Sequence, residues 1–296
     1  MNRWCRWLLS ITVTASVLLG IVSPAAAQPA AGSSSQPVYL AMGDSVAAGV
    51  GAPSRASGYV GQLANILRER TACAPGLPGN GGADRAAARC KQLQLIDLAE
   101  GGSTTQSMIN GDPDNAPQLG PATDLLLLRN GNANPRDDVR FITITIGGND
   151  VFIPVLAACT PLPGPQCEST VTGQLTTFAT NLVTILSTLR TAAGPDTTIV
   201  VTAYANPLIG NGCGLEEFVN LANVVLEGGS LFGVTLPAGL NTITRAVADR
   251  YQVLVADAFG RLGEDDFIDD CLHPNESGYD IYTTIFADTI LASGTT

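Results

Sequence analysis

The chain has 296 residues, enough to bury a large hydrophobic core, and its 26 acidic against 15 basic residues give a formal net charge of −11. Because affinity for nucleic acids and for anionic lipid surfaces comes largely from Lys and Arg, this balance argues against a nucleic-acid-binding protein and against attachment to anionic membranes. Only 14% of the residues are charged, so we expect a surface rich in uncharged polar side chains.

The first 27 residues have the pattern of a secretory signal peptide. Arg3 and Arg6 precede an apolar run over 7–22, and three alanines at 25–27 supply a small-residue cleavage site. The run is shorter than the roughly 20 residues that span a bilayer, although an uncleaved anchor is the alternative. We therefore expect a secreted, extracellular protein without stable membrane insertion. Loss of two arginines would leave 13 basic and 26 acidic residues, a net charge of −13.

Residues 28–36 form a polar leader, and residues 37–296 are expected to form a single domain. Short apolar runs predict five buried strands, at 37–42, 93–98, 139–146, 197–202 and 252–255. Apolar residues at helical spacing predict helices over 58–70, 104–110, 122–129, 170–193, 240–250 and 278–291. Strands that alternate with helices indicate an α/β fold with a parallel sheet covered on both faces. Active sites in such folds lie at the carboxyl ends of the strands.

Two further apolar segments, 151–157 and 226–240, are open to two interpretations. They could form a groove for an acyl chain, or they could be ordinary hydrophobic core.

Six cysteines remain once the signal peptide is removed, and an even number in an exported chain predicts three disulfides. Pairing along the sequence closes the smallest loops, so we expect Cys73–Cys90, Cys159–Cys167 and Cys213–Cys271. A zinc site is the alternative, but the chain has no C-x-x-C pair and only one histidine, so no metal site is expected.

Four polar blocks carry the chemistry. Three follow predicted strands and the fourth precedes the last helix: Gly43-Asp44-Ser45, 97–104, Gly147-Gly148-Asn149-Asp150 and 270–273. They supply a hydroxyl, hydrogen-bond donors, and a carboxylate three residues before an imidazole. Acyl transfer requires this inventory of nucleophile, base, orienting group and oxyanion donors.

His273 is the only histidine, so any Ser-His mechanism in this chain must use it. Asp270 has the spacing to accept a hydrogen bond from Nδ1, which leaves Nε2 free to take a proton, and Asp269 is its competitor. Ser45 follows a predicted strand and a turn glycine, although Asp44 or Ser45 could simply cap a helix. Asn149 could likewise cap a turn.

The four blocks, in this order over residues 43–273, resemble those of the SGNH (GDSL-type) hydrolase family. The resemblance implies a three-layer α/β/α sandwich with a flavodoxin-like sheet and ester hydrolysis through an acyl-enzyme. By position it implies that Ser45 is the nucleophile, His273 the base and Asp270 its orienting group. It also implies an oxyanion hole made of the Ser45 N–H, the Gly102 N–H and the Asn149 side-chain amide. Secreted bacterial esterases and lipases with three disulfides are the members that this chain resembles.

The chain departs from the family pattern in its second block. Asp97 stands where the family more usually has Asn, so the hydrogen bonding behind this loop is expected to differ. Gly101 competes with Gly102 for the donor role, and the threonines that follow favour Gly102. Some secreted relatives orient the histidine by a backbone carbonyl instead of a carboxylate.

The sequence therefore predicts a monomeric serine esterase or lipase that acts on lipid or small acyl esters and uses no cofactor. A polysaccharide acetyl esterase, a phospholipase or an acyltransferase on the same fold is the alternative within this class. A secreted domain that binds a lipid or a glycan without catalysis is the alternative from another class.

Overall fold

The computed structural model describes residues 36–70, 93–159, 165–210, 218–231 and 233–294. They are built around a five-stranded sheet with the order β2-β1-β3-β4-β7, in which every neighbouring pair is parallel. This is the flavodoxin-like order once the strands of a separate hairpin are set aside. The sheet consists of β1 (Val38–Gly43), β2 (Gln94–Asp97), β3 (Val139–Thr145), β4 (Thr198–Ala203) and β7 (Leu254–Asp257). The predicted α/β fold with a parallel sheet of five strands is confirmed.

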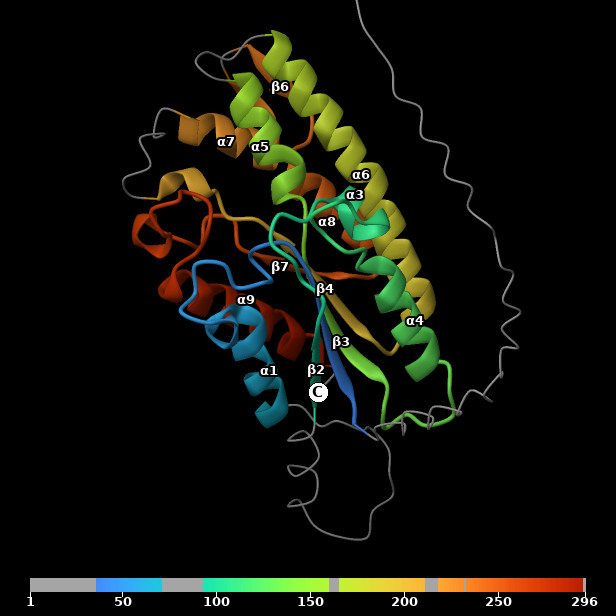
Figure 1. The fold of residues 1–296 in the computed structure, drawn as a ribbon. Helices are drawn as coiled ribbons and strands as arrows, with labels where there is room; N and C mark the ends of the chain where they lie inside the picture. The colour runs from blue at the N-terminus through green and yellow to red at the C-terminus, as the bar shows by residue number, and fades with distance from the viewer. Residues whose placement is uncertain (1–35, 71–92, 160–164, 211–217, 232, 295–296) are drawn as a thin grey trace, which may run out of the picture. The chain divides into compact units, whose positions relative to one another are not determined.

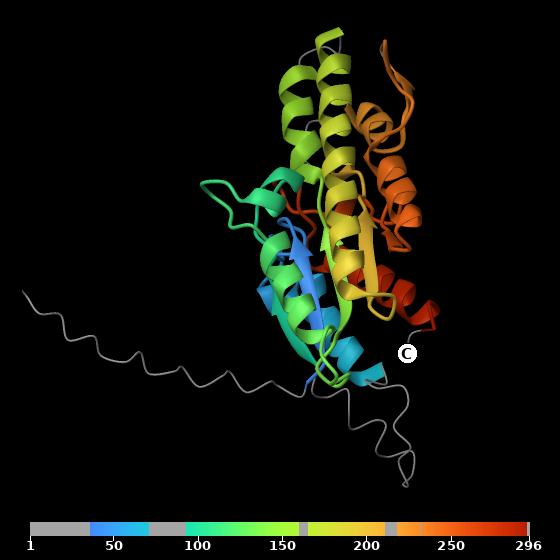
Figure 2. The same ribbon diagram turned by 90° about the vertical axis from the view of Figure 1, so that its right-hand side faces the viewer.

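Helices cover both faces of the sheet and give the three layers that were expected (Figures 1 and 2). On one face α1 (Tyr59–Arg70) packs on α9 (Glu276–Ala292), which also contacts β4 and β7. On the other face α6 (Pro165–Ala193) packs against both α4 (Leu119–Arg129) and α8 (Leu240–Arg250). Because both faces are covered, every residue of β1 and β4 is buried.

A group of shorter elements gathers beyond the carboxyl ends of the strands (Figure 1). The amino-terminal half of α6 continues past the sheet and carries an unbroken buried stripe that includes Val171, Leu175 and Phe178. α5 (Gly148–Cys159) packs on α6, and so does the hairpin of β5 (Gly229–Leu231) and β6 (Val234–Leu236). α7 (Val219–Glu227) packs on α8. α3 (Thr105–Asn110) lies between α4 and α6.

The structure differs from the sequence-based expectation at several boundaries. α6 begins at Pro165, five residues before the expected start. β7 begins two residues late because Gln252 has a positive φ of 54°, which turns the chain before the strand. The segment 151–157 is part of α5, where Val151 is buried in the core whereas Ile153 lines a cavity. In the segment 226–240, Leu226, Val234, Leu236 and Leu240 are buried in the core, whereas the other residues of β5 and β6 are partly or fully exposed.

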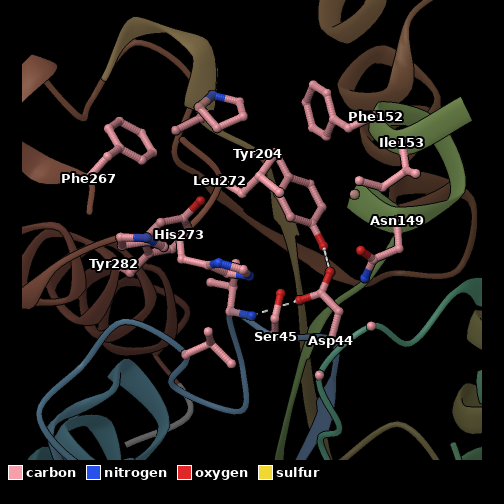
Figure 3. A pocket seen from close by; sticks show the side chains of 18 residues that line it. Asp44, Ser45, Asn149, Phe152, Ile153, Tyr204, Phe267, Leu272, His273 and Tyr282 are labelled. Carbon is pink, nitrogen blue, oxygen red and sulfur yellow. Dashed lines mark hydrogen bonds between the residues drawn. The ribbon is translucent and has the colours of Figure 1, made fainter. Parts of the chain in front are cut away.

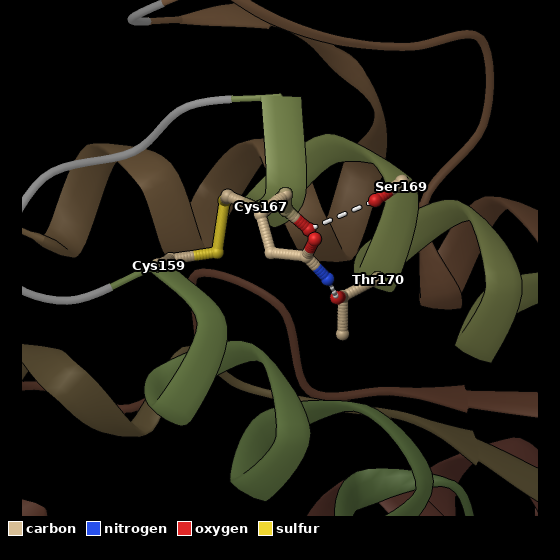
Figure 4. The surroundings of a disulfide bond; sticks show 5 residues. Cys159, Cys167, Ser169 and Thr170 are labelled. Carbon is tan, nitrogen blue, oxygen red and sulfur yellow. Dashed lines mark hydrogen bonds between the residues drawn. A yellow bond between two sulfur atoms is a disulfide. The ribbon is translucent and has the colours of Figure 1, made fainter.

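One disulfide is complete within the described residues: Cys159 at the end of α5 is bonded to Cys167 in α6, as predicted (Figure 4). Cys271 is also disulfide-bonded. The expected partners Cys73, Cys90 and Cys213 lie outside the described residues, as do the expected signal peptide over 1–27 and the leader up to residue 35. Among the described helices, none combines the length and apolar character needed to cross a membrane.

Candidate active site

The end of β1 is held by backbone contacts that only glycine allows. Gly43 has a φ of +143°, and a Cβ there would lie 2.4 Å from the carbonyl oxygen of Thr145 at the end of β3. The Gly43 N–H donates to Oε1 of Gln118 at 2.8 Å, and Nε2 of Gln118 donates to the Gly43 carbonyl at 2.8 Å. The turn that follows therefore has a defined position, and it presents Ser45 at the carboxyl edge of the sheet.

Asp44 turns inward, behind Ser45. It is only 2% exposed and accepts hydrogen bonds from the hydroxyls of Tyr204 and Thr145 and from the Val46 N–H. Burial raises the pKa of Asp44 to about 6, although the hydrogen bond from Tyr204 and the two others lower it. The carboxylate thus anchors the turn that carries Ser45.

The loop after β2 and the turn after β3 are joined by Ser103. Nε2 of Gln118 donates to Oγ of Ser103 at 3.1 Å, and Nδ2 of Asn149 donates to the Ser103 carbonyl at 3.0 Å. A primary amide has two N–H bonds, so this contact fixes the Asn149 side chain and leaves its second hydrogen for another acceptor. The side chain of Asn149 lines the same cavity as Ser45.

Two residues that line this cavity have backbone amides without an acceptor among the described residues. Gly102 has a φ of +83°, which favours glycine, and neither its N–H nor that of Ser45 donates to an acceptor within the described part of the chain. Gly101 lines the cavity as well. With the Asn149 amide, these N–H groups are the type of donor set that stabilises an oxyanion.

Asp150 secures the start of α3. Its carboxylate is buried and accepts hydrogen bonds from the Thr105 N–H at 2.9 Å and from the Thr105 hydroxyl. Burial raises the pKa of Asp150, against the lowering effect of these hydrogen bonds. The fourth residue of the third block therefore supports the loop that carries Gly102.

Asp97, which stands where the resembled pattern more usually has Asn, forms an ion pair with Arg55. Its Oδ2 lies 3.1 Å from Nε of Arg55, and its Oδ1 accepts a hydrogen bond from the Ala99 N–H at 3.0 Å. Arg55 also donates to the Ala99 carbonyl. The charge of Asp97 is thereby neutralised at the beginning of the second block.

His273 lies in the loop before α9, where Asp270 contacts its ring. Nδ1 of His273 is 2.5 Å from Oδ2 of Asp270, and Oδ1 of the same carboxylate accepts the N–H groups of Leu272 and His273 at 3.0 Å each. Burial raises the pKa of Asp270, but the hydrogen bond to the ring and those to the two amides outweigh it and leave the pKa lowered. Asp270, and not its competitor Asp269, is therefore the carboxylate at Nδ1. Cys271 has a positive φ of 62° in this tight loop.

The loop of His273 is tied to the segment that follows Ser45. Gly51 has a φ of +94°, and a Cβ there would lie 2.4 Å from the Pro274 carbonyl oxygen and 3.4 Å from Cβ of His273. The hydroxyl of Tyr279 donates to the Val50 carbonyl at 2.6 Å. These contacts bring the last and the first of the four blocks together.

Residues of all four blocks line one cavity of about 260 Å³. Ser45, Gly102, Asn149 and His273 all line it, and Figure 3 shows Ser45, Asn149 and His273 directed toward this common space. Within the described residues no hydrogen bond joins Ser45 to His273, and catalytic contacts of this type often tighten only in the complex with substrate. Among the described residues, no group of three metal-ligating side chains is present.

Two residues that contribute to this site, Tyr204 and Gln118, were not identified from the sequence. Tyr204 follows β4, so the rule that sites lie at the carboxyl ends of strands could have found it. Gln118 has no such signal, because it contacts Gly43 from 75 positions away in the sequence.

An open parallel sheet with a serine, a carboxylate-bound imidazole and free amide donors at its carboxyl edge defines a hydrolase of the serine type. The chain matches the GDSL-like lipase/acylhydrolase family over residues 41–281, and it belongs to that family. It is therefore a serine ester hydrolase. A search of curated proteins found no similar sequence.

Solved structures with the same fold include the lipase Lip_vut3 from a goat rumen metagenome. It is 17% identical, with a TM-score of 0.54 over 86% of this chain and 97% of that one. The comparison also found Axe2, an acetylxylan esterase from Geobacillus stearothermophilus, at 12% identity and a TM-score of 0.49 over 86% of this chain and 94% of that one.

Proposed function

We propose that this protein is a secreted carboxylic ester hydrolase in which Ser45, His273 and Asp270 act as a catalytic triad on lipid or small acyl esters. The observation that carries the proposal is the meeting of Ser45 and His273, 228 positions apart in the numbering, in one cavity with the imidazole already bound to Asp270. The apolar lining of this cavity by Phe152, Ile153, Phe267 and Leu272 favours apolar esters.

The geometry supports the following reaction. Nε2 of His273 takes the Ser45 proton as Oγ attacks the ester carbonyl, and Asp270 holds the proton on Nδ1. The charge that develops on the carbonyl oxygen is stabilised by the N–H groups of Ser45 and Gly102 and by the Asn149 amide. His273 then protonates the leaving alcohol, and water, activated by the same imidazole, releases the acid from the acyl-enzyme.

A fluorophosphonate probe tests the nucleophile. Peptide mapping should locate the adduct on Ser45, and Ser45→Ala should abolish both labelling and turnover of p-nitrophenyl esters, whereas Ser54→Ala, at an exposed serine nearby, should change neither. His273→Ala should slow labelling by orders of magnitude. Wild-type turnover in Ser45→Ala would refute the assignment, and a folded chain without labelling would indicate a binding domain.

Secretion is tested by expressing the full chain in a host with a functional export pathway. Mass spectrometry of the protein from the medium should find an amino-terminus near Gln28. Retention of residues 1–27 on a membrane-bound protein would support the anchor instead.

A further inference from the structure

The cavity at Ser45 has two ends that differ in chemistry (Figure 3). At one end His273 lies beside Phe267 and Leu272, which come from the loop before α9. At the other end Asn149 lies beside Phe152 and Ile153, on the first turns of α5. No acidic or basic side chain lines the α5 end among the described residues, because Asp44 lies beneath Ser45 and His273 lies at the opposite end.

The proton transfers assign a part of the ester to each end. The base must give its proton to the leaving oxygen, so the alcohol part has to lie on the His273 side. The acyl part stays attached to Ser45 Oγ while its carbonyl oxygen points at the Asn149 amide. The acyl chain points away from the leaving oxygen, and the apolar surface on that side of the cavity is formed by the ring of Phe152 and by Ile153 of α5.

A second cavity lies on the far side of that ring. It is formed between α5, the short helix η3 (Pro207–Ile209) and α7, and its volume is about 20 Å³. Its walls are apolar throughout, and Val155, Leu208 and Leu221 are among them. Phe152 lines both cavities and is 7% exposed, so its side chain is the partition between them.

We propose that Phe152 terminates the acyl site and sets the longest acyl chain that the enzyme accepts, with the cavity between α5 and α7 as a closed extension. This inference rests on the proposed function. Each methylene buried in the acyl site raises kcat/KM about fourfold, so kcat/KM climbs with chain length until the chain meets the ring. The preferred substrates are then esters of short to medium unbranched acids.

The test is a series of p-nitrophenyl esters from acetate to palmitate, measured below their aggregation limits. Phe152→Ala joins the two cavities, so the chain length of maximal kcat/KM should increase by several methylenes and the longest productive esters should gain at least tenfold. Phe152→Trp thickens the partition and should shorten the maximum. Thermal unfolding and labelling at Ser45 establish that each variant is folded and competent.

A matched control removes the same side chain at the other end. Phe267→Ala should leave the acyl-chain maximum unchanged, because Phe267 lines the alcohol end, and should instead change selectivity among acetate esters of different alcohols. Ala222 lines the second cavity alone, so adding Ala222→Leu to Phe152→Ala should cancel the gain on long chains.

An unchanged maximum in a folded Phe152→Ala or Phe152→Trp variant that labels at Ser45 would overturn the acyl-site assignment and leave the proposed function intact. Loss of labelling in the wild type would instead refute the proposed function. A shift of the maximum in Phe267→Ala alone would show that the two ends are reversed.

Discussion

Asn149 contributes to the site through a single amide hydrogen, because the Ser103 carbonyl occupies the other. Asn149→Ala should therefore reduce kcat by about 100- to 1,000-fold, the usual cost of one oxyanion donor, and change KM little. Steady-state kinetics on p-nitrophenyl butyrate checks this, with Asn110→Ala, at an exposed position, as the control. A loss confined to KM would mean that Asn149 binds substrate without stabilising the oxyanion.

The titration of Asp44 should make the free energy of unfolding depend on pH. Burial raises its pKa to about 6, above the value near 3.9 of an unfolded chain, so the folded protein binds this proton more tightly. The contribution of Asp44 to stability is thus complete below about pH 4 and is lost as the pH rises through 6.

Asp44→Asn should remove this dependence. The amide keeps one oxygen for Val46 and Thr145 and places an N–H opposite the Tyr204 hydroxyl, without an ionisable group. Relative to the wild type, the variant should gain stability between pH 4 and 7 by an amount on the order of 3 kcal/mol, measured by urea unfolding at each pH. A stability difference that does not change with pH would show that Asp44 titrates at its ordinary value.

The disulfide between α5 and α6 secures the elements that surround the second cavity. It joins residues separated by 8 positions, and Cys159 itself lines that cavity. In the chain-entropy account a loop of this length contributes about 2–3 kcal/mol. Cys159→Ser/Cys167→Ser should lower the free energy of unfolding by that amount, measured by guanidinium unfolding. Equal stability with and without the bond would mean that strain in the folded state offsets the entropic gain.

Elements with a clear apolar period were predictable from the sequence, and those without one were not. β3 is a run of β-branched residues between polar neighbours, and α6 has apolar residues at helical spacing from Val171 onward. α5 follows Gly147, begins with Gly148, contains Pro154 and is apolar on more than one side, because it faces both the core and the cavity. Its sequence therefore lacked the single apolar stripe that identifies a surface helix.

The same distinction holds for the site. Ser45, Asn149 and His273 stand in local blocks with turn glycines or a nearby carboxylate, so the sequence could point to them. Tyr204 acts on Asp44 from 160 positions away, and only the fold brings the two together. Groups that act through distant backbone or carboxylate partners have no local pattern to find.

At the scale of the whole molecule, the excess of 11 negative charges should act on charged substrates. Compared with p-nitrophenyl butyrate, the anionic p-nitrophenyl hemisuccinate should show a kcat/KM that rises severalfold as salt increases from about 0.01 to 0.1 M. The reason is that the Debye length falls from about 30 to about 10 Å over this range, which screens the repulsion. The neutral ester should respond little. Equal responses of the two esters would show that the local field at the site, and not the net charge, governs access.

At Gly51 the segment that follows Ser45 lies very close to the loop that carries His273. Because Gly51 has no Cβ, the carbonyl oxygen of Pro274 can approach its backbone closely. Any larger residue would push the loop of His273 away from the segment that follows Ser45, because its Cβ would lie 2.4 Å from the Pro274 carbonyl oxygen. In the proposed mechanism, the distance between the imidazole and the serine hydroxyl is therefore limited by a residue with no chemistry of its own.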